Sequence, residues 1–169
     1  MKYILSLMLL WGIILTPFSS YAASIQEKNK IITEHNAIRK SVKIPGLLWD
    51  NSLAKSAEQW AKKLATKKSF EHSNTSNGEN LYIYWVSWQT LTSLWNDAVK
   101  SWGDEKNWYD ITKNSCQKWK VCGHYTQIIW KNTKKVGCWK ALYRDGDWEK
   151  VIWVCQYSPA GNYKGEKPY

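Results

Sequence analysis

Gly123-His124-Tyr125-Thr126-Gln127-Ile128-Ile129-Trp130 is the stretch that decides the fold, because it joins an imidazole to a short apolar run. Tyr125, Ile128 and Ile129 recur at helical spacing, which predicts a short helix with one face in the core. His124 falls in the first turn of that helix, where its ring can point into a cleft. A single histidine in such a place is more often structural than a ligand, so its role depends on its partners.

Three distant residues favour a functional role for this histidine: His72, Glu79 and Glu105. His72 and Glu79 lie in residues 69–80, a polar segment whose small side chains and single glycine predict turns. Functional groups are often carried by such loops when a rigid scaffold holds them.

Three helices are expected from hydrophobic periodicity and cap signals. The first covers residues 25–42 and ends before Pro45-Gly46. The second is capped by Asp50 or Asn51, and its apolar stripe consists of Leu53, Ala57, Trp60, Ala61 and Leu64. The third covers residues 90–102 and breaks at Gly103, just before Glu105.

The β-structure is expected mainly near the C-terminus. Residues 81–85 predict one short strand. Residues 136–143 and 151–157 predict two strands around Asp145-Gly146-Asp147, a strong hairpin signal. Residues 158–169 contain two prolines and two glycines and should be irregular.

The chain has four cysteines, and an even number predicts two disulfides: Cys116, Cys122, Cys138 and Cys155. The count alone leaves three pairings open. Each strand of the predicted hairpin holds one cysteine, so a bond from Cys138 to Cys155 would staple it. The spacings do not provide the close cysteine pairs of a zinc site.

The N-terminus has the layout of a secretory signal peptide. Lys2 precedes an apolar run over residues 3–15, and small residues follow, which predicts a signal peptide over residues 1–22 with cleavage after Ala22 or Ala23. A membrane anchor is less favoured, because the run is shorter than the ~20 residues that span a bilayer. Residues 23–169 are expected to form one secreted domain, periplasmic if the source is a Gram-negative bacterium.

The net charge of +10 comes almost entirely from lysine, since Arg39 and Arg144 are the only arginines. Nucleic-acid binders more often cluster arginine with aromatic residues on one element, so we expect no nucleic-acid partner. The lysines are spread along the chain, which favours a solvated surface. Attraction to an anionic cell surface is the second interpretation.

Two long segments resemble the signatures of the CAP superfamily of cysteine-rich secretory proteins, antigen 5 and pathogenesis-related 1 proteins. They are GHYTQIIWKNT (residues 123–133) and VCQYSPAGNY (residues 154–163). His72-Ser73 and Gly78-Glu79-Asn80 extend the resemblance, which covers residues 25–169. Asp104-Glu105-Lys106 and the tail over residues 161–169 are most similar to the plant pathogenesis-related 1 type.

The resemblance implies an α+β fold, an α-β-α sandwich with a small antiparallel sheet between helices. It also implies a cleft lined by His72, Glu79, Glu105 and His124, in which His72 and His124 hold Zn²⁺ or another divalent cation. Two protein nitrogens should bind it weakly. The alternative is a hydrogen-bonded network that only holds the cleft together. The implied disulfides are Cys116–Cys122 and Cys138–Cys155.

Three functions follow from the resemblance. We favour a non-catalytic module that binds a sterol, a fatty acid or another small apolar ligand, with a role in defence or host interaction. The second is a metal-dependent hydrolase or protease with Glu79 or Glu105 as general base, although no hydrolase motif supports it. The third is a precursor of a C-terminal signalling peptide that includes Pro159, Gly161, Asn162, Pro168 and Tyr169.

Overall fold

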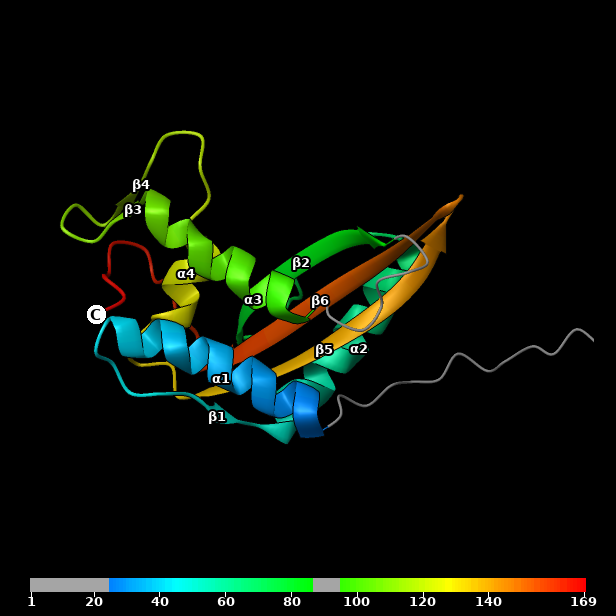
Figure 1. Ribbon diagram of the computed structural model, residues 1–169, viewed down its shortest axis with the longest axis horizontal. Coiled ribbons are helices and arrows are strands. Elements are labelled where there is room, and N and C mark those ends of the chain that lie inside the picture. Colours follow the sequence, from blue (N-terminus) through cyan, green and yellow to red (C-terminus); the bar gives the residue numbers. More distant parts are fainter. Residues whose placement is uncertain (1–24, 87–94) are drawn as a thin grey trace, which may run out of the picture.

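A four-stranded sheet between helices forms the centre of the molecule in the computed structural model, which describes residues 25–86 and 95–169 (Figure 1). The helices are α1 (Ile25–Ser41), α2 (Asn51–Lys67), α3 (Trp95–Asp104), the 3₁₀ helix η1 (Glu105–Trp108) and α4 (Gly123–Ile128). The strands are β1 (Leu48–Trp49), β2 (Gly78–Val86), β3 (Tyr109–Asp110), β4 (Ser115–Cys116), β5 (Lys135–Asp145) and β6 (Trp148–Ser158). The predicted signal peptide and residues 90–94 of the predicted third helix lie outside the described residues.

The strand order is β1-β5-β6-β2. β5 and β6 form the predicted hairpin, whose antiparallel register runs from Lys135 opposite Ser158 to Asp145 opposite Trp148. β2 is antiparallel to β6, whereas β1 is parallel to β5, so the sheet is mixed and not purely antiparallel. A second, two-stranded sheet pairs β3 with β4.

Both faces of the sheet carry an apolar core, which confirms the α-β-α sandwich. Because side chains alternate along a strand, β6 contributes Trp153 and Tyr157 to one core and Ile152 and Val154 to the other. The first core lies against α1, α3 and α4, and the second lies against α2. Figure 1 shows α1 and α3 in front of the sheet and α2 behind it.

Helix α2 follows the prediction closely. Asp50 is its N-cap, since its carboxylate accepts the backbone N–H groups of Ser52 at 2.9 Å and Leu53 at 3.0 Å. The predicted stripe is buried, apart from Trp60, which is half-buried at the edge of the second core.

Several predicted boundaries are wrong. β5 continues to Asp145 and β6 begins at Trp148, so both strands extend further toward the hairpin turn than predicted. Helix α3 continues through Gly103 to Asp104. A Cβ on Gly103 would lie 2.7 Å from Ile38 Cδ1, so this glycine permits a close approach of α1 and α3 and not a turn. Strand β2 begins at Gly78 and not at residue 81, because its first residues pair with the end of β6. Glu79 therefore lies on a strand and not in the polar loop.

Both disulfides pair as the resemblance implies. Cys116–Cys122 joins β4 to the start of α4, and Cys138–Cys155 links directly opposed residues of β5 and β6 in the first core. Of the helices in residues 25–86 and 95–169, none combines the length and apolar character that crossing a bilayer requires.

Candidate ligand and metal site

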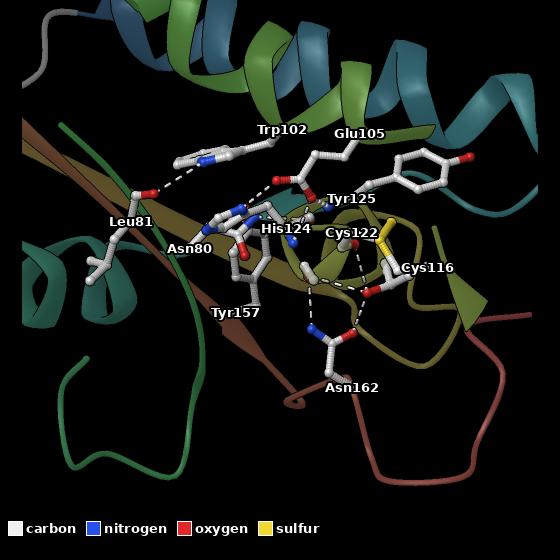
Figure 2. A network of polar contacts seen from close by, with 12 residues as sticks. Asn80, Leu81, Trp102, Glu105, Cys116, Cys122, His124, Tyr125, Tyr157 and Asn162 are labelled. Carbon is white, nitrogen blue, oxygen red and sulfur yellow. Dashed lines mark hydrogen bonds and ion pairs between the residues drawn. A yellow bond between two sulfur atoms is a disulfide. The ribbon is translucent and has the colours of Figure 1, made fainter. Parts of the chain in front are cut away.

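His124 and Glu105 form a tightly fixed pair. His124 lies in the first turn of α4, as predicted, and Glu105 opens η1. His124 Nδ1 is 2.6 Å from Glu105 Oε1, while Glu105 Oε2 accepts the backbone N–H groups of His124 and Tyr125, each at 3.0 Å (Figure 2). A carboxylate oxygen accepts hydrogen bonds, so Nδ1 is the donor, and in the neutral imidazole the lone pair then lies on Nε2.

Two residues outside the predicted set hold His124 in place. The Trp102 indole stacks on the imidazole with ring centroids 5.9 Å apart, and its Nε1 donates to the Leu81 carbonyl at 3.2 Å. Asn80 Nδ2 donates to the His124 carbonyl at 3.1 Å (Figure 2). Periodicity identifies Trp102 as a core residue, but its contact with a histidine 22 positions away is a tertiary feature.

His72 and Glu79 form the second pair. His72 Nδ1 is 2.9 Å from Glu79 Oε1, which also accepts the Ser73 N–H at 2.9 Å. Glu79 Oε2 accepts from Gln156 Nε2 at 3.1 Å, across the β2–β6 ladder. The side chain of Glu79 is 5% exposed and that of His72 is 63% exposed, so a buried carboxylate positions a solvent-facing imidazole.

The four predicted residues therefore form two histidine–glutamate pairs. In each pair the carboxylate binds Nδ1 and leaves Nε2 available, an arrangement common for zinc-binding histidines. Within residues 25–86 and 95–169, no group of three His, Cys, Asp or Glu side chains could hold a metal ion. That both imidazoles meet at one cation thus stays a prediction.

A hollow of about 620 Å³ adjoins one of these pairs. Its lining residues come from β2, the end of α3, η1 and the loop before α4, and they are Tyr82, Tyr84, Lys100, Ser101, Asp104, Glu105, Trp108 and Val121. Glu105 is the one member of the predicted tetrad in this lining. No sequence pattern singled out the two tyrosines, which share a face of β2 because they are two residues apart.

A buried polar chain runs from His124 into the first core. Asn80 Nδ2, which also contacts the His124 carbonyl, donates to the Tyr157 hydroxyl at 3.2 Å. Tyr157 donates to His35 Nε2 at 2.9 Å, and His35 Nδ1 donates to the Ile31 carbonyl at 2.8 Å. Burial lowers the pKa of His35 to about 4 and raises the pKa of Tyr157 well above its usual value. Both side chains are therefore neutral, and His35 is structural.

The predicted peptide segment packs against α4 and the loops beside it. Gly161 N–H donates to Gln127 Oε1 at 3.0 Å. Asn162 bridges the first turn of α4, because its Nδ2 donates to the Gly123 carbonyl and its Oδ1 accepts from Thr126, both at 2.8 Å (Figure 2). The Pro168 carbonyl accepts the Lys131 N–H at 2.7 Å. The tail is thus irregular, as predicted, but attached along its length.

Among solved structures, NaASP2 with Zn²⁺ is 27% identical with a TM-score of 0.67, covering 90% of this chain and 88% of that chain. Venom allergen-like protein 4 of Schistosoma mansoni is 25% identical with a TM-score of 0.64, covering 83% of this chain and 92% of that chain. These similarities agree with the sandwich described above.

Among sequences, Pathogenesis-related protein PRMS of Zea mays is 36% identical over 171 residues, covering 98% of this chain and 96% of the relative. Pathogenesis-related protein 1A of Nicotiana tabacum is 38% identical over 135 residues, covering 80% of this chain and 76% of the relative. The family model described as "CAP: Cysteine-rich secretory protein family" matches residues 32–157. With the fold and both disulfides in agreement, the chain belongs to the CAP family.

Proposed function

We propose that this chain is an extracellular binding protein that acts through a small ligand held in the hollow beside Glu105. Its relatives are plant pathogenesis-related proteins, which supports a role in defence or host interaction. Its two disulfides suit an oxidising compartment. One observation carries the proposal: Glu105 both lines the hollow and binds His124, so the hollow adjoins the candidate metal site.

The lining of the hollow favours a sterol over a fatty acid. Its volume of about 620 Å³ is within the range of small-molecule sites. Tyr82, Tyr84 and Trp108 offer aromatic surface to an apolar ring system. The polar part contains the carboxylates of Asp104 and Glu105 and the ammonium group of Lys100, which is paired with Asp104 at 2.5 Å. Asp104 can accept a hydrogen bond from a sterol hydroxyl, whereas the two carboxylates outnumber the one cation and disfavour the carboxylate of a fatty acid.

A divalent cation would be held by His72 and His124 through Nε2. Each imidazole is already oriented by a carboxylate, at 2.9 Å for His72 and 2.6 Å for His124, which supports this donor set. A bound Zn²⁺ would supply positive charge and Lewis acidity. With two protein ligands we expect weak, exchangeable binding. The similar protein NaASP2 was solved with Zn²⁺, which also supports the proposed cation site.

The hydrogen bonding of both glutamates favours binding over catalysis. Glu105 accepts one imidazole N–H and two backbone N–H groups. Glu79 accepts from His72, Ser73 and Gln156. A general base needs an oxygen within reach of the proton that it removes, and in both residues the two oxygens already have partners. We therefore favour a binding protein over a metal-dependent hydrolase as the function of this chain.

Labelled cholesterol and palmitate test the ligand proposal. We expect saturable cholesterol binding that Ser101→Trp abolishes, because Ser101 is an exposed residue that lines the hollow. Ser52→Trp is the matched control, since Ser52 is exposed on α2, across the sheet. Absence of saturable binding of either lipid, or equal loss in both variants, would contradict the proposal.

Calorimetric titration with Zn²⁺ alone tests the cation site. We expect His72→Ala and His124→Ala each to abolish binding, and Glu105→Gln to weaken it about 10- to 100-fold because the imidazole loses its orienting carboxylate. Unchanged zinc affinity in the double histidine variant would assign the metal to another site.

A further inference from the structure

Residues 117–121 form a wholly exposed loop between β4 and α4, closed by the Cys116–Cys122 disulfide. Trp119 is 90% exposed and Val121 is 60% exposed. Figure 1 shows this connection rising away from the helices at one end of the molecule. Single exposed apolar side chains are common on soluble proteins, so exposure alone assigns no role to the loop.

The backbone fixes Trp119 in an outward position. Its φ of 66° is uncommon for a bulky residue. The turn is closed by a hydrogen bond from Lys120 N–H to the Gln117 carbonyl at 3.0 Å, and Gln117 N–H donates to the Trp108 carbonyl at 2.8 Å. Together with the disulfide, these bonds preorganise the loop, which lowers the entropy lost on binding a partner.

The exposed apolar residues are flanked by cations. Lys118 Nζ lies 5.1 Å from the Trp119 ring centroid, and Lys120 Nζ lies 4.0 Å from that of Trp108. In the described parts of the chain, neither lysine forms an ion pair with a carboxylate. The adjoining β3–β4 turn adds Lys113, whose charge is opposed by Asp110 at 3.6 Å. The loop itself is therefore positive as well as aromatic.

We propose that this loop docks the protein on an anionic phospholipid bilayer. Tryptophan is favoured at the membrane–water interface, so Trp119 would enter the headgroup region while Lys118 and Lys120 contact anionic lipids. The exposed aliphatic side chain of Val121 favours a bilayer over an acidic polysaccharide as the partner of the loop. An aliphatic side chain gains from contact with acyl chains, whereas sugars stack on aromatic rings. Val121 also lines the hollow, but Lys118, Trp119 and Lys120 lie outside its lining, so the docking does not depend on a ligand in the hollow.

Flotation with vesicles of phosphatidylcholine, alone or mixed with phosphatidylserine, tests the docking. We expect binding only to the mixed vesicles, and about tenfold weaker binding for Trp119→Ala because an interfacial aromatic contact is lost. Trp148→Ala is the matched control, since Trp148 is 58% exposed but opens β6 at the hairpin tip. Absence of binding to mixed vesicles, or equal binding of Trp119→Ala and the wild type, would overturn the proposal.

Two double variants distinguish the effect of the loop's lysines on vesicle binding from the effect of the protein's net charge. Replacing Lys118 and Lys120 with Gln should weaken binding about 25-fold, from about fivefold per lysine near a charged surface. Replacing Lys30 and Lys40 on α1 with Gln changes the net charge equally but should weaken binding far less. Equal losses in the two double variants would contradict docking by the loop. Trp119-dependent binding to heparin without binding to vesicles would assign the loop to polysaccharides.

Discussion

His35 is a single residue that makes the stability of the fold depend on pH. The side chain is completely buried, it accepts from Tyr157 through Nε2 and it donates to Ile31 through Nδ1. Protonation of Nε2 would replace the accepted hydrogen bond with two facing donors. This geometry agrees with a pKa lowered from 6.5 to about 4, first by burial and then by the charge of Arg39.

We predict that stability falls between pH 6.5 and about 4 because of this residue. His35 is neutral in the folded state, so the unfolded state binds more protons in that window and the free energy of unfolding rises with pH. The pKa difference between 6.5 and about 4 corresponds to roughly 3 kcal/mol. Denaturant titrations across this range should show a flatter pH dependence for His35→Gln than for the wild type.

Acidic groups with lowered pKa values contribute to both slopes equally, so their effect cancels when His35→Gln is compared with the wild type. Hydrogen bonds lower the pKa values of Asp50 and Glu58 in the folded state, and the stability they provide begins to be lost as the pH falls toward the unfolded values of 3.8 and 4.5. Identical slopes for His35→Gln and wild type between pH 6.5 and 4.5 would contradict the assignment to His35.

Arg39 is a buried cation that donates to backbone carbonyl groups. Its guanidinium donates to Pro45 at 2.6 Å, to Ile128 and Trp130 at 2.7 and 2.9 Å, and to Thr133 at 3.1 Å. Three of these carbonyls lie at or just beyond the C-terminal end of α4, so one side chain fixes the helix that carries His124 at the end opposite Glu105.

We predict that Arg39→Met lowers the free energy of unfolding by about 3 kcal/mol or more, because several buried carbonyls lose their donor. Arg39→Lys should rescue little, since an ammonium lacks the planar fork. The chain's other arginine is the control. The Arg144 side chain is 57% exposed and lies 3.6 Å from Glu149, so Arg144→Met should cost about 1 kcal/mol at most. Similar losses for both arginines in urea denaturation would refute the argument.

At the scale of elements, the contact between α2 and β5 depends on Gly137. A Cβ there would lie 2.6 Å from the Asp50 carbonyl oxygen and would clash with the Ala54 nitrogen. Both are backbone atoms of the α2 N-terminus, which cannot move without shifting the helix. The close approach of this helix to the sheet therefore requires a glycine at this position.

We predict that Gly137→Ala costs about 3 kcal/mol, the upper part of the range for overpacking, because backbone and not a flexible side chain must give way. Gly123→Ala is the control, since its Cβ would meet only Asn162 Nδ2 at 3.9 Å. Thermal unfolding measures both. A melting temperature for Gly137→Ala equal to that of Gly123→Ala would show that α2 shifts without cost.

The elements that the sequence predicted correctly are those whose signals are local. Periodicity and an Asx cap define α2, and a turn with alternating apolar residues defines the β5–β6 hairpin. The parallel pairing of β1 and the start of β2 at Gly78 depend on partners far along the chain. The passage of α3 through Gly103 depends on Ile38, which no local pattern reveals.

The candidate site also combines features with a sequence signal and features that depend on contacts between distant residues. The tetrad could be predicted only through the resemblance of two signatures and their flanking motifs, and the structure arranges it as two pairs. The residues that support it were not predicted, because Trp102 and Asn80 act through contacts between elements. The chemistry available to the site can thus be inferred from its residue types, whereas the orientation of its side chains is known only from the folded structure.

For the whole molecule, the proposed ligand hollow and the proposed docking loop meet at one residue. Val121 lines the hollow and also belongs to the exposed loop. Trp108 lies in the same hollow, beneath Lys120 of the loop. A bilayer bound by the loop would therefore lie next to the hollow, so a lipid could pass between them over a short path.

The C-terminal tail raises the question of whether a peptide can leave the folded molecule. Residues 159–169 cover Trp130, which is 3% exposed and packs against Tyr163 with ring centroids 6.0 Å apart. Thr133 Oγ1 also donates to the Pro159 carbonyl at 2.9 Å, beside the bond that a protease would cut. A protease needs an extended, accessible segment, so cleavage before Pro159 requires this region to open first.

We predict that release of residues 159–169 is limited by unfolding and therefore follows global stability. Gly137→Ala destabilises the α2–β5 contact without touching the tail, and a loss of about 3 kcal/mol should raise the cleavage rate about 100-fold if opening is global. Mass spectrometry of timed digests measures the released peptide, with Arg144→Met as the stable comparison, because Arg144 is exposed on β5 and pairs with Glu149. If Gly137→Ala and wild type release it equally fast, the tail detaches by local fraying, and a folded CAP domain could shed it as a signal.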